Sequence, residues 1–190
     1  MMGTIADSGE GTDQVNGYGG GKEPGGEHGA PLTQEQVLGI KETWAVLAQD
    51  PVERGADLFM KIFEEDPELK KLFYFADEGR ELSRDDQRMR SHGERVMEAV
   101  GAAVDSLEDL AAVVPVLTEL GALHHKYGVQ PSYFDTVGAA LIYTLETNLG
   151  DKLTPHIRQG WVLVYGIVGA TMKKGMQRAM DQQNLDKTCP

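Results

Sequence analysis

From Leu32 onward, apolar residues recur every three or four positions, which is the spacing of one face of an α-helix. The first such run contains Val37, Ile40 and Trp44, and it follows the stretch Thr33-Gln34-Glu35-Gln36. A threonine followed three residues later by a glutamine is typical of a capping box at a helix start. No convincing alternation of apolar and polar residues, the mark of a half-buried strand, appears in the sequence. The pattern therefore predicts an all-α fold.

Prolines mark further helix starts. Asp50-Pro51, Asp66-Pro67 and Thr154-Pro155 each place a good capping residue before a proline, and Gln130-Pro131 is a weaker version of this signal. Two late segments, residues 138–149 and 161–172, are apolar on more than one face, which is typical of helices that are buried from several sides or face a large ligand. Six or seven helices are predicted, one after Thr33 and the others near residues 51–65, 67–73, 84–104, 109–126, 131–149 and 155–180.

The two ends of the chain differ from its middle. Residues 1–30 contain ten of the 23 glycines, scattered acidic residues and no apolar periodicity. Such a segment cannot bury enough surface to offset the entropy lost on ordering, so we expect a flexible, disordered Gly-rich tail. We therefore expect an acidic tail over residues 1–30, one domain over residues 31–180 and a short C-terminal tail over residues 181–190.

Charge and composition exclude several classes of function. The net charge of −12 argues against nucleic-acid binding and against docking on an anionic membrane surface. The longest apolar run, residues 161–172, is shorter than the ~18 residues of a membrane-spanning helix. The N-terminus lacks the pattern of a secretory signal, and the single cysteine, Cys189, excludes an internal disulfide. We expect a cytoplasmic protein with no membrane span.

Two histidines lie on apolar faces of different predicted helices. His92 extends a stripe that continues with Val96, and His124 extends a stripe that contains Leu120. The adjacent His125 is rotated by about 100° from that stripe and is expected at the rim or in solvent. His92 and Val96 are four residues apart, as are Leu120 and His124, so the side chains of each pair are neighbours on one helix face.

Zinc is a poor match for these histidines, because it needs three or four protein ligands and no third ligand has suitable spacing. Two imidazoles on either side of a porphyrin, with apolar stripes covering its faces, would match well. Alternatively, each is a core histidine bonded to a backbone carbonyl, and adjacent histidines are simply polar residues at a helix end. Periodicity leaves both interpretations open.

Three spaced motifs occur in order along the chain. Pro67 opens a short helix with Phe73 six residues later, Val96 follows His92 by four residues, and Gly128-Val129 follows His124 by four and five. In these motifs the chain resembles the globin family, and within it the neuroglobin-like animal globins, some of them six-coordinate. The resemblance covers roughly residues 32–175.

The resemblance implies a globin fold, with six to eight helices around a pocket for haem b (iron protoporphyrin IX). It implies that His124 is the proximal iron ligand and His92 the distal histidine. The second nitrogen of His124 would donate to a backbone carbonyl, for which Leu120 is the candidate. Arg95 would pair with a haem propionate or lie solvated at the surface. The remaining pocket residues implied are Phe59, Phe73, Phe75, Val96, Val129, Tyr133, Phe134 and Val137.

The function implied is reversible binding of oxygen, carbon monoxide or nitric oxide, with His92 competing for the iron as a sixth ligand. Storage or transport of oxygen would use this property directly. The same haem can also serve an enzyme that reduces nitrite or oxidises nitric oxide, which would need a separate reductase. A redox or gas-sensing module with a signalling partner is the third alternative. The sequence does not distinguish these uses.

Overall fold

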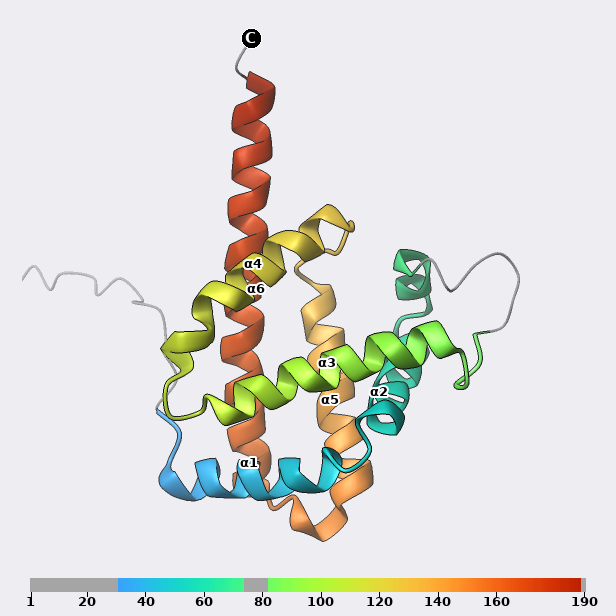
Figure 1. The fold of residues 1–190 in the computed structure, drawn as a ribbon, viewed down its shortest axis with the longest axis vertical. Helices are drawn as coiled ribbons and strands as arrows, with labels where there is room; N and C mark the ends of the chain where they lie inside the picture. Colours follow the sequence, from blue (N-terminus) through green and yellow to red (C-terminus); the bar gives the residue numbers. More distant parts are fainter. Residues whose placement is uncertain (1–30, 74–81, 189–190) are drawn as a thin grey trace, which may run out of the picture. The chain divides into compact units, whose positions relative to one another are not determined.

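The computed structural model of the protein describes residues 31–73 and 82–188, so the predicted tail over residues 1–30 and the candidate pocket residue Phe75 lie outside the described residues. The described part contains α-helices and short 3₁₀ helices and no strand, which confirms the all-α prediction (Figure 1). The elements are α1 (Gln34–Leu47), α2 (Pro51–Glu65), η1 (Pro67–Leu72), α3 (Gln87–Asp105), η2 (Leu110–Val113), α4 (Val114–Lys126), α5 (Tyr133–Leu149), η3 (Gly150–Lys152) and α6 (Pro155–Thr188).

Helix starts lie where capping residues predict them. The capping box is confirmed, because Thr33 Oγ1 accepts from the Gln36 backbone N–H at 3.1 Å and Gln36 Oε1 accepts from the Thr33 N–H at 3.0 Å. Asp50 caps α2 and Asp66 caps η1, each through a side-chain oxygen that accepts from the backbone of the first turn. These caps satisfy N–H groups that a helix start otherwise leaves without a partner.

Two predicted helix starts are displaced by three residues or more, and α5 begins at Tyr133, two residues after its predicted start at residue 131. α3 begins at Gln87 and not near residue 84, because the Asp86 side chain accepts from the backbone N–H groups of Arg88 and Met89 and fixes the start there. The segment predicted as one helix over residues 109–126 is a 3₁₀ turn followed by α4, which begins at Val114 with Pro115 in its first turn. In both cases a local cap or a proline sets the boundary.

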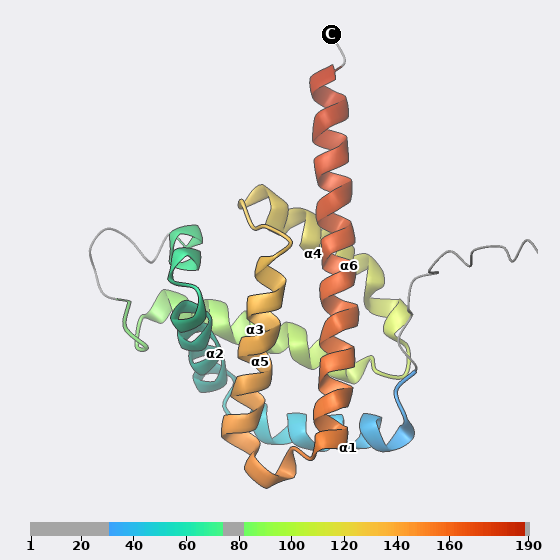
Figure 2. The ribbon, with the colours of Figure 1, turned by 180° about the vertical axis from the view of Figure 1, so that it is seen from behind.

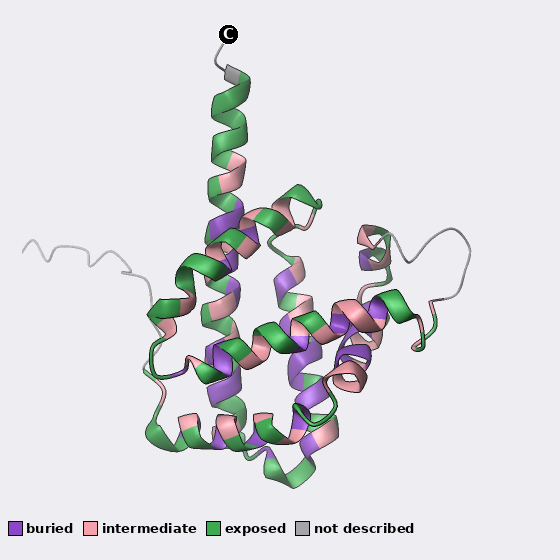
Figure 3. Ribbon diagram, viewed as in Figure 1, coloured by how far each residue is buried: buried purple, intermediate pink, exposed green. Residues whose placement is uncertain are grey.

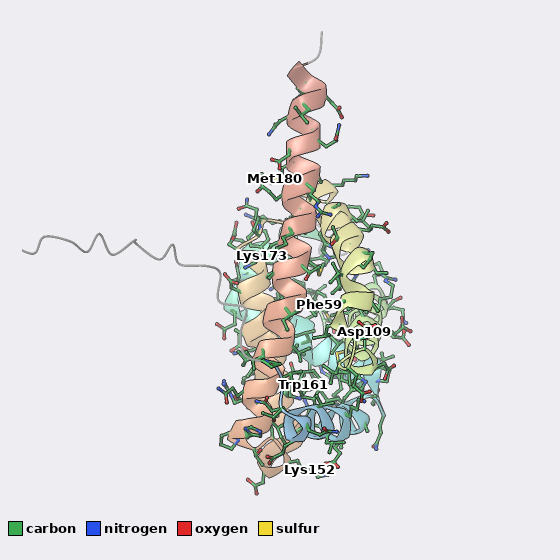
Figure 4. All side chains as sticks on the ribbon, turned by 90° about the vertical axis from the view of Figure 1, so that its left-hand side faces the viewer. Phe59, Asp109, Lys152, Trp161, Lys173 and Met180 are labelled. Carbon is green, nitrogen blue, oxygen red and sulfur yellow. The ribbon has the colours of Figure 1, made fainter. Side chains whose placement is uncertain are left out.

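Helix α6 extends past residue 180 to Thr188. Residues 177–188 contain neither glycine nor proline, and Gln177 and Gln182 donate to Asp181 and Asp186 one turn further on at 2.8 and 2.9 Å. Figure 4 labels Met180 on the part of α6 that runs beyond the other helices. Among the described residues, no helix combines the length and apolar character needed to cross a membrane.

The core lies between α1, α2, α3, α5 and the first half of α6, and Figure 3 colours the buried segments of these helices purple. Trp161 of α6 is its largest fully buried side chain, and its ring lies 6.2 Å from that of Trp44. The Trp161 indole N–H donates to Thr43 Oγ1 at 3.1 Å, so this polar atom is satisfied inside the core. Within the described part of the chain, every buried side-chain nitrogen and oxygen has a hydrogen-bond partner.

Two helix crossings bring backbones into direct contact at glycines. α2 crosses α3 at Gly55 and Gly93, where a Cβ on Gly93 would lie 2.7 Å from a backbone atom of Gly55. α4 crosses α6 at Gly121 and Gly175, where a Cβ on Gly175 would lie 1.9 Å from the Thr118 carbonyl oxygen. Figure 2 shows the second crossing from behind. No other residue type permits such close approach, and each crossing lies within three residues of one of the candidate histidines.

Candidate cofactor-binding site

A cavity of about 670 Å³ lies between α3 and α4, with α2, η1, α5 and α6 completing its wall. Its lining is almost entirely apolar, as is usual for a pocket that binds a small organic molecule. The structure brings together all the predicted pocket residues that it describes, because each of them lines this cavity: Phe59, Phe73, His92, Arg95, Val96, Leu120, His124, Val129, Tyr133, Phe134 and Val137.

His92 lies on the α3 side of the cavity between two phenylalanine rings. Its imidazole centroid is 5.1 Å from that of Phe59 and 5.4 Å from that of Phe73, and both pairs meet edge to face. Burial is the largest cause that lowers the pKa of His92 to about 4, and electrostatic interactions with Arg95 and His124 contribute the rest of the shift. His92 is therefore neutral at neutral pH, and its interaction with His124 agrees with both imidazoles facing one cavity.

Arg95 contacts His92 at the rim of the cavity. One turn separates the two residues on α3, and Arg95 Nη2 lies 3.2 Å from His92 Nδ1. A guanidinium has only N–H donors, so in this hydrogen bond Arg95 donates and the imidazole nitrogen accepts. The Arg95 side chain itself is exposed, and the contact lies where the cavity meets solvent.

His124 lies on the α4 side of the cavity and has the opposite kind of partner. Its Nδ1 is 2.8 Å from the carbonyl oxygen of Leu120, one turn back, as the sequence predicted. Because a carbonyl only accepts, Nδ1 carries the proton and Nε2 has a free lone pair. The ring centroid lies 6.3 Å from that of Phe134. His124 is thus held in the tautomer that a metal ligand needs.

The end of α4 explains the two adjacent histidines. Gly128 has φ of +80°, a left-handed conformation that ends a helix and that glycine adopts without strain. Its N–H donates to the His125 carbonyl, and the Val129 N–H donates to that of His124. His124, His125 and Lys126 occupy the last turn, where positive charge is favourable. Of the two adjacent histidines, only His124 lines the cavity.

Tyr165 of α6 is a further residue of the cavity wall, and it connects two of the helices that form it. Its hydroxyl donates to the Phe134 carbonyl oxygen at 2.6 Å, and its ring occupies the space that a side chain at Gly138 would fill. Burial raises the pKa of Tyr165, so the phenol remains a neutral donor. This bond ties α6 to the first turn of α5, where Tyr133, Phe134 and Val137 line the cavity.

Sequence reasoning missed much of the wall that α6 supplies. The lining residues that were not predicted share one face of that helix, with a spacing of three or four positions. The signal was present, since residues 161–172 are apolar on more than one face, but the pattern alone does not distinguish a second packing face from a ligand-facing one. The missed α6 residues are Trp161, Val164, Val168 and Met172.

The cavity suits a flat apolar group that carries its own metal. Within residues 31–73 and 82–188, no three His, Cys, Asp or Glu side chains come together to hold a metal ion by themselves. The cavity instead offers single imidazoles from two helices, with apolar walls between them. A macrocycle that supplies the other metal ligands matches this set.

Comparison with known proteins identifies the family that the chain resembles. Residues 56–172, more than half of the chain, match the globin family. A neuroglobin of Tetraodon nigroviridis is 35% identical over 138 residues, which cover 72% of this chain and 87% of the relative. A neuroglobin of Danio rerio is 35% identical over 140 residues, with the same coverage. The fold is similar to the crystal structure of a hexacoordinated heme protein from an anhydrobiotic tardigrade, with a TM-score of 0.70, 20% identity, and coverage of 77% of this chain and 96% of that one.

Proposed function

The chain belongs to the globin family, and we propose that it binds haem b in the cavity between His92 and His124 and thereby binds oxygen and other diatomic gases reversibly. The observation that carries the proposal is the hydrogen bond from His124 Nδ1 to the Leu120 carbonyl at 2.8 Å. This bond leaves Nε2 free to bind iron, in a cavity that is otherwise apolar. Bound haem would supply an iron centre for a gas such as oxygen, carbon monoxide or nitric oxide.

The dimensions and chemistry of the cavity support this proposal. Its volume of about 670 Å³ lies within the usual range for cofactor pockets. Leu120 and Val129 on the α4 side, and Val96 on the α3 side, would cover the two faces of the porphyrin. Arg95, at the rim, would be available to a propionate. The chain would therefore offer haem an imidazole ligand, apolar faces and a cation.

His124 would act as the proximal ligand, and Leu120 would hold its ring in place. The Leu120 carbonyl fixes the proton on Nδ1 and sets the ring orientation, and it increases the basicity of Nε2. The glycine crossing between α4 and α6 holds the helix that carries both residues. His124 would thus meet the iron without rearranging.

His92 would act on the gas side of the haem. Phe59 and Phe73 pack against its ring and would exclude water from the space above the iron. Here His92 would either donate a hydrogen bond to a bound gas or occupy the sixth position itself. The tardigrade protein of similar fold is described as a hexacoordinated heme protein, which supports the second state as a competitor. Gas affinity is then reduced by the fraction of iron that His92 occupies.

The test compares two neighbouring histidines. His124→Ala and His125→Ala are loaded with haem, reduced without oxygen and exposed to carbon monoxide while the visible spectrum is recorded. We expect His124→Ala to lose the native spectrum and to release haem faster, because its Nε2 is the proposed ligand. His125→Ala serves as the matched control, since it changes the same residue type one position away, outside the cavity.

Native protein that takes up no haem would overturn the proposal. So would equal spectra for the two variants, because the iron would then have no dependence on His124. A native protein with haem but no spectral change under carbon monoxide would leave a haem protein without the proposed gas binding, which also contradicts it.

A further inference from the structure

The Nδ1 atoms of the two cavity histidines have opposite hydrogen-bond partners, an acceptor for His124 and a donor for His92. His124 Nδ1 faces a carbonyl oxygen, which only accepts, at 2.8 Å. His92 Nδ1 faces the Arg95 guanidinium, which only donates, at 3.2 Å. Since a neutral imidazole carries one proton, each partner fixes which nitrogen carries it. The proton lies on Nδ1 in His124 and on Nε2 in His92.

These tautomers have different consequences for iron. A nitrogen binds a metal through its lone pair, which an N–H nitrogen does not have available. Nε2 of His124 is therefore a ligand, whereas Nε2 of His92 is a hydrogen-bond donor for as long as Arg95 holds Nδ1. In that state His92 can stabilise a bound gas but cannot close the sixth position.

We propose that Arg95 is a positioning residue that selects the donor tautomer of His92 and so sets the fraction of iron left open to gas. The proposal rests on the haem-binding function proposed above, and it adds a residue that controls the competition between His92 and gas. While it donates to Nδ1, Arg95 would lower the closed fraction, which is the fraction of iron that His92 occupies. When it turns away, the proton moves to Nδ1 by exchange with water, and Nε2 becomes a ligand with no net change in charge.

The position of each group suits this role. Phe59 and Phe73 pack against the His92 ring and limit its rotation, so the tautomer and not the ring orientation is the variable. Arg95 is exposed at the rim, so its side chain can leave the ring without unpacking the core. A packed ring beside an exposed donor is the arrangement that such a control needs.

Two substitutions of Arg95 give an ordered test. Arg95→Leu removes the donor, and Arg95→Glu replaces it with a carboxylate that would accept a hydrogen bond from Nδ1–H, keep the proton on Nδ1 and so favour Nε2 as a ligand. Arg178 is exposed on α6 and does not line the cavity, so Arg178→Leu and Arg178→Glu are controls with matched charge. All are studied as haem-loaded protein.

The visible spectrum of the ferrous protein, recorded without oxygen, measures the fraction of iron that His92 occupies. Mixing with carbon monoxide then measures the rate at which the gas binds. We expect the closed fraction to rise in the order native, Arg95→Leu, Arg95→Glu. The carbon monoxide binding rate should fall by about three- to tenfold in Arg95→Leu, as expected for loss of one exposed charge-assisted hydrogen bond. Both Arg178 variants should match the native protein.

A second measurement reads the tautomer directly. Proton–nitrogen correlation spectra of the carbon monoxide complex, with labelled histidine, distinguish the protonated ring nitrogen from the bare one. We expect His92 to carry its proton on Nε2 in the native complex and to show a larger Nδ1–H fraction in Arg95→Glu.

Several outcomes would overturn the inference while haem still binds. If iron coordination is unchanged in both Arg95 variants, Arg95 does not control the occupancy of the iron by His92. Faster haem loss with unchanged coordination would assign Arg95 to a propionate instead. If His92 of the native protein carries its proton on Nδ1, Arg95 does not select the Nε2–H tautomer. Failure of haem binding in the native protein, by contrast, would overturn the proposed function itself.

Discussion

His92 is a polar ring placed between two phenylalanines, and its surroundings determine its charge. The Phe59 and Phe73 centroids lie 5.1 and 5.4 Å away, and burial is the largest of the causes that lower the pKa of His92 to about 4. A neutral ring in an apolar site avoids the large cost of burying a charge. The same neutrality lets the ring serve as donor or ligand, according to where its single proton lies.

Replacing His92 by leucine should therefore open the sixth iron position while keeping the site apolar. We expect His92→Leu to bind carbon monoxide faster, by about tenfold if His92 closes nine-tenths of the iron. Flash photolysis of the haem-loaded protein measures this rate. His125→Leu is the control, because His125 does not line the cavity. Equal rates for His92→Leu and native protein would exclude competition by His92.

At the scale of elements, α4 is positioned by backbone contact with α6. Cβ atoms on Gly121 and Gly175 would lie 2.0 and 1.9 Å from carbonyl oxygens of Met172 and Thr118. Neither overlap can be relieved by a side-chain rotation, because the opposing atoms are backbone. Any side chain here must push the two helices apart, and α4 carries His124 with it.

A single methyl group tests this crossing. Gly175→Ala should lower the free energy of unfolding by about 1–3 kcal/mol, the usual cost of overpacking, and should speed haem loss. Gly166→Ala makes the same change in the same helix, where nothing lies within 4 Å. It should raise the free energy of unfolding by about 0.5–1 kcal/mol, because alanine favours helix over glycine. Urea unfolding measures both, and equal effects would show that the crossing has no special role.

The start of α3 is tied to α2 by an ion-pair network. Glu53 of α2 accepts from Arg84, just before α3, and from Arg90 in its first turn, while Asp57 also accepts from Arg84. The two arginines lower the pKa of Glu53 to about 2, with the Arg90 hydrogen bond as the largest cause. Arg90 is two residues before His92, so this network helps to position the part of α3 that carries His92.

The network makes stability depend on pH. The folded pKa of Glu53, about 2, is below its ordinary value of 4.5, so its contribution is complete above pH 4.5 and is lost as pH falls toward 2. We expect Glu53→Gln to lower the melting temperature near pH 7 and to approach the native protein as the pH falls through this range. Thermal unfolding at several pH values measures the difference. Glu98→Gln, exposed on α3, should show no such convergence.

At the scale of the whole molecule, the sequence predicted best what local chemistry determines. Thr33, Asp50 and Asp66 cap helices where expected, because a capping side chain acts within its own turn. His92 and His124 were identified from helical spacing and from family motifs, and the structure places both in one cavity. Local signals of this kind survive folding unchanged.

Features that depend on packing between distant segments could not be predicted. The direction of the Arg95 side chain, toward the His92 ring, depends on where the ring is held by α2 and η1. The contribution of Val164 and Val168 to the cavity depends on which face of α6 remains after Trp161 packs on α1. Such choices are made by the assembled helices and are not encoded in any single stretch.

The length of α6 has a consequence for how the protein melts. The helix contains 34 residues, about 51 Å at 1.5 Å each, and side chains 181–187 are all exposed. A short isolated helix is limited by nucleation, but here the packed part of α6 supplies the nucleus, so each added residue requires only propagation. We therefore expect the outer turns to exchange with coil more readily than the packed part of the helix does. Warming should shorten them gradually, residue by residue, well before the packed helices unfold together.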